Sequence, residues 1–253
     1  MKKQLVLFTI LLLAGRTYGQ NGEMLSGVVS YSDVAKVEIK IEGDASQFAH
    51  MLPNEIKSEK QLVFTKDETI YKSKEEATNL EDAMSEGGQV MKISMGVSND
   101  ILYTSLEDGK TIEQKDFMSR QFLISGEVAK PAWKITGSQK TILGYPCMEA
   151  MMEKDSIEVR AWFTSSIPVP AGPASYYGLP GLVLEVSLDG GDHLITAQSV
   201  ELKSIGADDL EKPKKGKKVT REEYDQIVAE KLEEQGIEGG GGEMRFIEIR
   251  IGD

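Results

Sequence analysis

Residues 161–184 read AWFTSSIPVPAGPASYYGLPGLVL, a run of 24 residues without a charge in a 253-residue chain that is 28% Asp, Glu, Lys and Arg. Its prolines at positions 168, 170, 173 and 180 would break a membrane-spanning helix. They also lack the N–H group that a residue in a central strand donates to its neighbour. The middle of the run, residues 167–173, therefore predicts a stiff, extended loop with polyproline-like geometry.

The proline-rich loop, residues 164–181, has two interpretations. In the first, it forms a rigid plug over one open end of a sheet, because apolar surface in a folded protein is usually covered. In the second, Tyr176, Tyr177 and Leu179 line or gate a pocket for an apolar ligand or an extended peptide, since long loops in compact domains often bind partners. The sequence leaves both interpretations open.

The loop ends in a predicted turn and follows a strand with two notable side chains. Residues 179–182 predict a type II turn, in which Pro180 presets the second position and Gly181 supplies a positive φ at the third. Arg160 and Trp162 share one strand face, where they could stack on each other before a ligand or pack against neighbouring strands. The candidate ligand- or partner-binding residues are Arg160, Trp162, Tyr176, Tyr177, Gly178, Leu179, Pro180 and Gly181.

These residues also carry a family resemblance. Residues 176–185, YYGLPGLVLE, resemble the signature of the GLPGLI family of exported Bacteroidetes proteins, with Val183 at the position of the last isoleucine. The resemblance covers about residues 130–190 and implies export and a β-rich domain, but no mechanism. Further matches in the same order are residues 133–135, 144–147, 161–164, 167–168 and 172–173.

Most of the chain alternates apolar and polar residues with a period of two, which is typical of half-buried strands. Turn residues such as Asp108-Gly109 separate these segments at short spacing, which favours hairpins. The predicted fold class is mainly β: a curved antiparallel sheet, similar in shape to the half-barrel of lipoprotein carriers, with short helices and one C-terminal amphipathic helix. The expected strands are residues 28–41, 60–66, 69–72, 90–97, 100–106, 111–117, 121–124, 133–136, 140–143, 147–153, 157–163, 182–188 and 193–204, with a short helix at 44–52 and an acidic, weakly helical segment at 75–87.

The N-terminus, residues 1–19, has the pattern of a secretory signal peptide. Two lysines precede an apolar run of ten residues, and small residues stand at Thr17 and Gly19. The run is too short to cross a bilayer, so we expect a cleaved protein that is periplasmic or secreted. Cleavage would remove three basic residues and no acid and take the formal charge from −12 to −15, which disfavours nucleic acid as a partner.

After the signal peptide we expect an antiparallel β domain over residues 20–206 and a tail over residues 207–253. The tail starts with a lysine-rich linker that should be solvated. Residues 220–223 match a capping box, which predicts an amphipathic helix that ends near residue 235. Residues 244–251 alternate again and predict a final strand that returns to the sheet.

The sequence has no recognisable catalytic motif: no nucleophile elbow, zinc-binding His-Glu-x-x-His, phosphate-binding glycine loop or calcium loop. The single cysteine, Cys147, allows no internal disulfide and is most simply a buried hydrophobe. It could pair with His193 only if folding brings the two together. With Met151 on its strand face, it would offer copper(I) at most two soft ligands, so methionine as core filler is the better interpretation and no metal or cofactor is expected.

We therefore expect an exported, non-enzymatic protein that binds an apolar small molecule or an envelope protein through the uncharged loop. Two alternatives come from other classes. One is an envelope hydrolase that uses acids near the loop, such as Glu185 and Asp192. The other is a copper-handling protein that uses Cys147 and neighbouring methionines.

Overall fold

The computed structural model describes residues 25–36, 54–74, 80–86, 89–95, 100–127, 131–154, 156–234 and 248–252. The expected signal peptide and the helix expected at residues 44–52 lie outside these ranges. The described part is mainly β, as predicted. None of its helices is long and apolar enough to cross a membrane.

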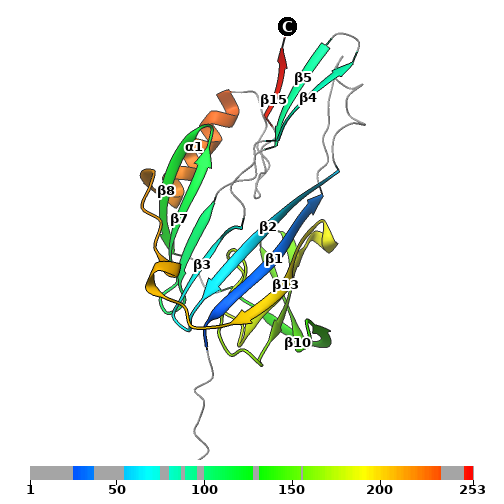
Figure 1. The fold of residues 1–253 in the computed structure, drawn as a ribbon, viewed down its shortest axis with the longest axis vertical. Helices are drawn as coiled ribbons and strands as arrows, with labels where there is room; N and C mark the ends of the chain where they lie inside the picture. The colour runs from blue at the N-terminus through cyan, green and yellow to red at the C-terminus, as the bar shows by residue number, and fades with distance from the viewer. Residues whose placement is uncertain are drawn as a thin grey trace, which may run out of the picture.

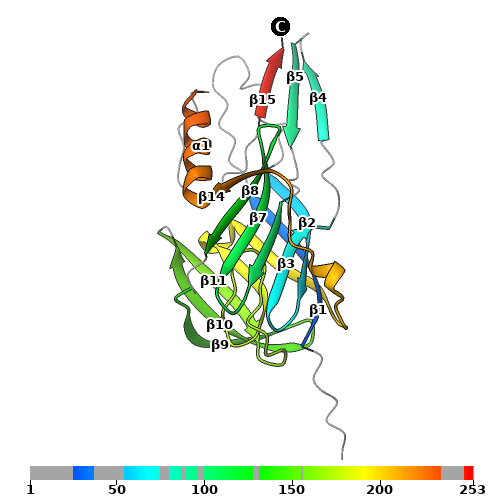
Figure 2. The same cartoon turned by 90° about the vertical axis from the view of Figure 1, so that its left-hand side faces the viewer.

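Twelve strands form one sheet in the order β14-β8-β7-β6-β3-β2-β1-β13-β12-β11-β10-β9. Neighbours are antiparallel except for β14, which runs parallel to β8. Figures 1 and 2 show that the sheet is open and strongly curved, which confirms the predicted fold class. The strands are β1 Gly27–Lys36, β2 Glu55–Phe64, β3 Glu68–Ser73, β6 Ile101–Ser105, β7 Lys110–Phe117, β8 Arg120–Glu127, β9 Lys134–Ile142, β10 Tyr145–Lys154, β11 Ile157–Thr164, β12 Leu182–Leu188, β13 His193–Leu202 and β14 Lys217–Thr220.

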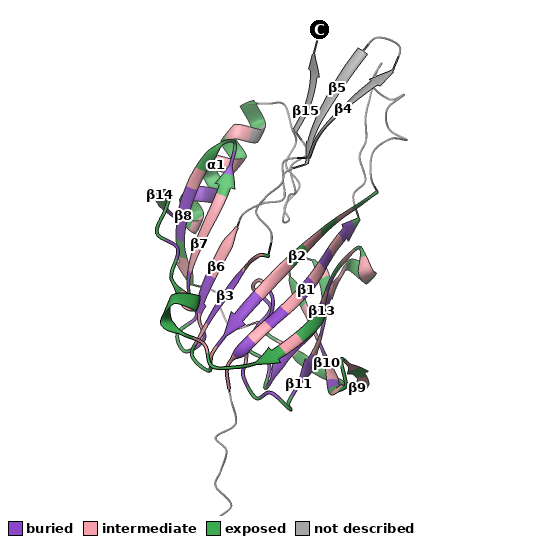
Figure 3. Ribbon diagram, viewed as in Figure 1, coloured by how far each residue is buried: buried purple, intermediate pink, exposed green. Residues whose placement is uncertain are grey.

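Side-chain alternation produces this sheet. Along β1 every second residue is buried, among them Val29 and Tyr31, while the residues between are half-buried. Figure 3 shows the same alternation of purple and pink along β1. One face of the sheet therefore faces the core, and we call the opposite face the outer face.

Four predictions about strands need correction. The two strands expected at residues 133–136 and 140–143 form the single strand β9. The acidic segment expected to be weakly helical contains the strand β4 (Leu80–Glu86), because pairing with β5 (Gln89–Met95) overrides a weak local helix preference. The final strand, β15 (Glu248–Gly252), does not return to the large sheet but pairs with β5 in a three-stranded sheet of order β15-β5-β4. The lysine-rich linker, expected to be solvated throughout, ends in the edge strand β14.

The helix α1 (Arg221–Glu234) begins as the sequence predicts. The Glu223 N–H donates to Thr220 Oγ1 at 3.2 Å, and the Thr220 N–H donates to Glu223 Oε2 at 2.8 Å, which completes the capping box. The Tyr224 ring packs edge-on against Phe122 and Phe117, with ring centroids 5.3 and 6.3 Å apart. The helix therefore covers the β8 end of the sheet.

The uncharged run fills the core of the curved sheet. Leu182, Val183 and Leu184 have no exposed surface, and Ile167, Val169 and Ala171 of the loop are equally buried. Polar groups of the loop backbone are paired within the loop: the Gly178 N–H donates to the Pro170 carbonyl at 2.9 Å. This pairing allows an irregular segment to lie in the core of the sheet, since a buried backbone polar group must find a hydrogen-bond partner.

Three side-chain hydrogen bonds hold the loop and the start of β12. The Tyr31 hydroxyl of β1 donates to the carbonyl of Val183 in β12 at 2.6 Å. Trp133 Nε1 donates to the carbonyl of Tyr177 in the loop at 2.9 Å. Thr164, the first residue of the loop, donates through Oγ1 to the Pro146 carbonyl, also at 2.9 Å. The loop is thus fixed at its beginning, at Tyr177 and just beyond its end.

The turn at residues 179–182 is not the predicted type II turn. The Gly181 N–H donates to the Leu179 carbonyl at 2.7 Å, so Pro180 lies at the centre of a three-residue γ-turn. The φ of Gly181 is 158°, far from the roughly +80° of a type II turn. Leu182 N–H instead donates to Ile167 at 3.0 Å. Glycine is required here for space, because a Cβ at position 181 would lie 2.1 Å from the Thr164 carbonyl oxygen.

We expect Gly181→Ala to lower the free energy of unfolding by about 1–3 kcal/mol, because the added methyl forces the backbone at Thr164 to move. Urea denaturation of the purified protein measures this loss. Gly206→Ala is the matched control, since its Cβ would meet the nearest atom only at 3.5 Å. Equal midpoints for the two variants would contradict the close approach at Gly181.

We expect Tyr31→Phe to cost about 1–2 kcal/mol at neutral pH, because the Val183 carbonyl loses its partner. Burial raises the pKa of Tyr31, so the folded state resists ionisation of this group. Wild-type stability should therefore fall as pH rises above the unfolded pKa of about 10, and Tyr31→Phe should flatten that fall. Denaturation midpoints between neutral and alkaline pH measure both effects.

Tyr145→Phe serves as the control for this substitution, because no hydrogen bond holds the Tyr145 hydroxyl within the described residues. A loss of stability as large as that of Tyr31→Phe would show that the effect is not specific to the Tyr31–Val183 bond.

Candidate functional site

The structure places the predicted loop residues mainly in the core. Tyr176, Tyr177 and Leu179 are only 2–3% exposed, whereas Gly178 and Pro180 are exposed at the surface. The three large side chains occupy the concavity that an apolar ligand would need. Of the two interpretations of the loop, its packing corresponds to the plug.

The other two predicted residues, Arg160 and Trp162, lie on the outer face of β11. Trp162 is half-buried, whereas its neighbours Ala161 and Phe163 are completely buried on the core side. The strand register places Trp162 directly opposite Glu149 of β10 and Glu185 of β12. We call the group Lys140, Glu149, Arg160, Trp162 and Glu185 the Trp162 patch.

Lys140, rather than Arg160, provides the cation above the Trp162 ring. Its Nζ lies 4.3 Å from the ring centroid and 2.7 Å from Glu185 Oε1. Arg160 instead turns to Glu158, with 2.7 Å between Nε and Oε1. Of the two arrangements considered for Trp162, packing against neighbouring strands is therefore the one that forms. The contact comes from β9, a strand that sequence spacing could not place beside Trp162.

Glu149 is the buried acid of the patch, with 6% of its surface exposed. Thr136 Oγ1 donates to Glu149 Oε2 at 2.6 Å, and Arg160 Nη1 lies 3.5 Å from Oε1. The Thr136 hydrogen bond, with a smaller contribution from Arg160, lowers the pKa of Glu149. The hydrogen bond with Glu158 is the main cause that raises the pKa of Arg160. Glu149 and Arg160 are thus both charged at neutral pH.

The acids near the loop are held by hydrogen bonds and ion pairs. A catalytic proton donor needs a raised carboxyl pKa, whereas that of Glu149 is lowered. Glu185 and Asp192, the acids considered for hydrolysis, are each paired with a lysine, Lys140 at 2.7 Å and Lys36 at 3.0 Å.

Cys147 lies opposite Lys140 in the β9–β10 pair and is 1% exposed. Burial raises the pKa of its thiol, which opposes the thiolate form that metals and nucleophilic catalysis require. His193 Nε2 lies 2.8 Å from Asp33 Oδ1, so its partner is an acid of β1. Across the described ranges, no group of three or more His, Cys, Asp and Glu residues could hold a metal ion.

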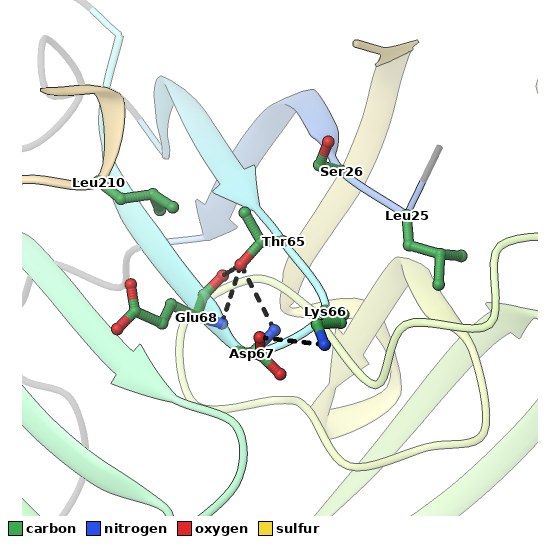
Figure 4. Close-up of a pocket in the computed structure, with 7 residues that line it drawn as sticks. All are labelled: Leu25, Ser26, Thr65, Lys66, Asp67, Glu68 and Leu210. Atoms are coloured by element: carbon green, nitrogen blue, oxygen red, sulfur yellow. Dashed lines mark hydrogen bonds and ion pairs between the residues drawn. The ribbon is translucent and has the colours of Figure 1, made fainter. Parts of the chain in front are cut away.

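Two open depressions lie elsewhere on the sheet. Figure 4 shows one of about 450 Å³, where the β2–β3 turn at Thr65 and Glu68 faces Leu210 of the connection to β14. The Thr65 hydroxyl there accepts the N–H of Glu68 at 3.1 Å, a bond that stabilises the turn. The second, of about 580 Å³, is lined in part by Tyr103 and Lys212. Neither contains a residue of the loop or of the Trp162 patch.

A family model described as "Protein of unknown function (Porph_ging)" matches residues 149–185. The match begins at Glu149 and ends at Glu185, the two acids on either side of Trp162. The GLPGLI name suggested by the sequence is not the name of this model and is not confirmed. A search of curated proteins gives no match.

Two solved structures of PNGF-II, in space groups P21 and C2, are similar in fold, each with a TM-score of 0.52 and 15% sequence identity. The similarity covers 80% of this chain but 33% and 32% of those chains. The chain therefore spans about a third of the length of the structures it matches. At this identity the likeness shows the β-rich fold alone.

We expect Thr136→Val to lower stability at pH 7 by about 0.5–1 kcal/mol, because Glu149 loses a hydrogen bond to its charged form. The folded pKa of Glu149 is lowered, so the stability it contributes is present above the unfolded pKa of about 4.3 and is lost as pH falls through the folded pKa. The cost of the substitution should therefore vanish in acid.

Urea denaturation as a function of pH, with an NMR titration of Glu149, measures this effect. Thr141→Val is the control, an exposed threonine on the same strand. A cost that persists unchanged after Glu149 is protonated would contradict the assigned role of Thr136.

Proposed function

We propose that this chain is an exported, non-enzymatic protein that binds a partner protein through the Trp162 patch. The observation that carries the proposal is a half-exposed tryptophan surrounded by an ordered set of ion pairs on the outer face of β11. Tryptophan and arginine are the residues that most often dominate the affinity of protein interfaces.

The charges of the patch support a protein partner. Each of the acids here, Glu149, Glu158 and Glu185, has a cation within 4 Å, from Lys140 or Arg160, in a chain with a formal charge of −12. These cations reduce the repulsion that the net charge creates for an acidic partner. Because the side chains already have defined partners, little rotamer freedom remains to be lost on binding.

The loop has a supporting role in this proposal. It connects β11 to β12, so its burial fixes the relative position of Trp162 on one strand and Glu185 on the next. An apolar small molecule has less support as the ligand, since the loop's own Tyr176 and Leu179 fill the core. Native mass spectrometry of gently purified protein provides a test of that alternative, which predicts a bound mass.

Photo-crosslinking in the cells of origin tests the proposal. A photoreactive amino acid at Ser187, which lies opposite Arg160 on β12, should yield one discrete crosslinked protein. The same amino acid at Ser199, an exposed serine on β13, should yield none.

The Trp162→Ala substitution should abolish the crosslink at position 187 and weaken binding of the identified partner by about 2 kcal/mol, roughly 30-fold. Titration calorimetry measures the affinity, and an unchanged denaturation midpoint shows that the variant is folded. Crosslinks of equal yield from positions 187 and 199, or full affinity without Trp162, would refute the patch as the binding surface.

A further inference from the structure

The larger of the two open depressions, of about 580 Å³, lies over β3, β6, β7 and β8 and has an acidic lining. The charged residues that line it are three acids, Glu68, Asp108 and Glu127, and two lysines, Lys110 and Lys212. Lys110 is already paired with Asp108, with 2.7 Å between Nζ and Oδ2. An excess of carboxylates in a hollow favours a cationic ligand, as does the formal charge of −12 on the whole chain.

One cation that occupies this depression comes from the chain itself. Lys212 lies in the connection between β13 and β14, which Figure 4 shows beside Glu68 at Leu210. The Lys212 Nζ is 4.4 Å from the centroid of the Tyr103 ring and 4.0 Å from Glu68 Oε1. The quadrupole of an aromatic ring attracts a cation above its face, and proteins use this attraction to bind ammonium ligands. Lys212 thus shows which chemical group the depression accepts.

Tyr103 and Glu68 are positioned by a hydrogen bond of their own. The Tyr103 hydroxyl donates to Glu68 Oε1 at 2.7 Å, which fixes the carboxylate beside the ring. Tyr103 is 3% exposed, and burial, followed by the hydrogen bond to Glu68, raises its pKa. The phenol therefore stays protonated at neutral pH and remains a donor to Glu68.

Lys212 is held weakly enough for another ammonium group to displace it. Its side chain is 50% exposed and that of Glu68 is 39% exposed, and ion pairs and cation–π contacts at exposed positions contribute little to stability. The connection also has other anchors. Pro213 is buried, and Gly216 approaches β8 so closely that a Cβ there would lie 2.7 Å from the backbone carbonyl carbon of Phe122.

We propose that this depression binds a small alkylammonium compound, whose ammonium group replaces that of Lys212 between the Tyr103 ring and Glu68. Lys212 then acts as a built-in competitor, with an effective concentration on the order of millimolar. Glu127, which has no cation within 4 Å among the described residues, is available for a second ammonium group of the ligand. The site is independent of the Trp162 patch.

Titration with cadaverine, a five-carbon diamine, tests the proposal, and the uncharged diol of the same length is the control ligand. We expect Lys212→Ala to bind cadaverine about threefold or more tightly than the wild type, because the competing ammonium group is removed. Lys214→Ala is the matched control variant, since Lys214 lies in the same connection, is 75% exposed and pairs with Glu211. It should bind cadaverine as the wild type does. Ligand-detected NMR measures these affinities.

A second substitution in the Lys212→Ala protein tests the carboxylate. Glu68→Gln keeps an acceptor for the Tyr103 hydroxyl but removes the charge, and it should weaken cadaverine binding by about three- to fivefold. N-acetyl-lysine methylamide distinguishes the sources of the ammonium group. Tighter binding of cadaverine indicates a free diamine, whereas equal or tighter binding of the lysine derivative indicates a lysine side chain of a polypeptide.

The wild type provides a further test that requires no variant to fold. The CεH2 protons of Lys212 lie near the Tyr103 ring and should show an upfield ring-current shift in the NMR spectrum, which cadaverine should remove. A Lys212 signal that does not respond at any cadaverine concentration would overturn the proposal. Equal affinities of Lys212→Ala and Lys214→Ala for cadaverine, or binding of the diol as tight as that of the diamine, would overturn it equally.

Discussion

The hydrogen bond from Tyr31 to the Val183 carbonyl, 2.6 Å long and completely buried, marks the constraint on which the fold depends. Tyr31 belongs to β1 and Val183 to β12, and β13 lies between these strands in the sheet. A twelve-stranded open sheet must curve to bury one of its faces, and the concave side must then be filled. The uncharged loop is that filling. The polar backbone groups of the loop are tolerated in the core because they find partners in Trp133 and in the loop itself, and Tyr31 bonds the backbone just beyond its end.

Because the loop fills the concave side of the sheet, the candidate binding residues of the Trp162 patch lie on the outer face. The loop connects β11 with β12, so its packing sets the register that places Trp162 between Glu149 and Glu185. The side chains of the patch then satisfy one another: Lys140 lies above the Trp162 ring and bonds Glu185, while Thr136 and Arg160 bond Glu149. The loop and the Trp162 patch thus lie on opposite faces of the part of the sheet formed by β9 to β12.

Several elements could be predicted from the sequence because their signals are local. Alternation of apolar and polar residues with a period of two identified β1, β7 and β11, and the capping box at residues 220–223 identified the start of α1. Absence of charge identified residues 161–184 as the unusual segment, and the two-residue spacing of Arg160 and Trp162 on one strand face identified them as candidate residues. Local signals do not reveal which strands pair, so β4, β14 and the partner of β15 were missed.

Only the tertiary structure decided how those elements are used. An uncharged loop can either fill the core or line a pocket. The contacts that distinguish the two join residues far apart in the sequence: Trp133 and Tyr177 are separated by 44 residues, and Tyr31 and Val183 by 152. Likewise, the cation above Trp162 comes from Lys140, two strands away in the sheet, and not from Arg160 beside it in the chain. The amino-acid sequence by itself determined a charge-free segment and alternating strands, because both are properties of neighbouring residues. The curvature of the sheet, the burial of the loop and the composition of the patch arise from long-range packing, which no local pattern encodes.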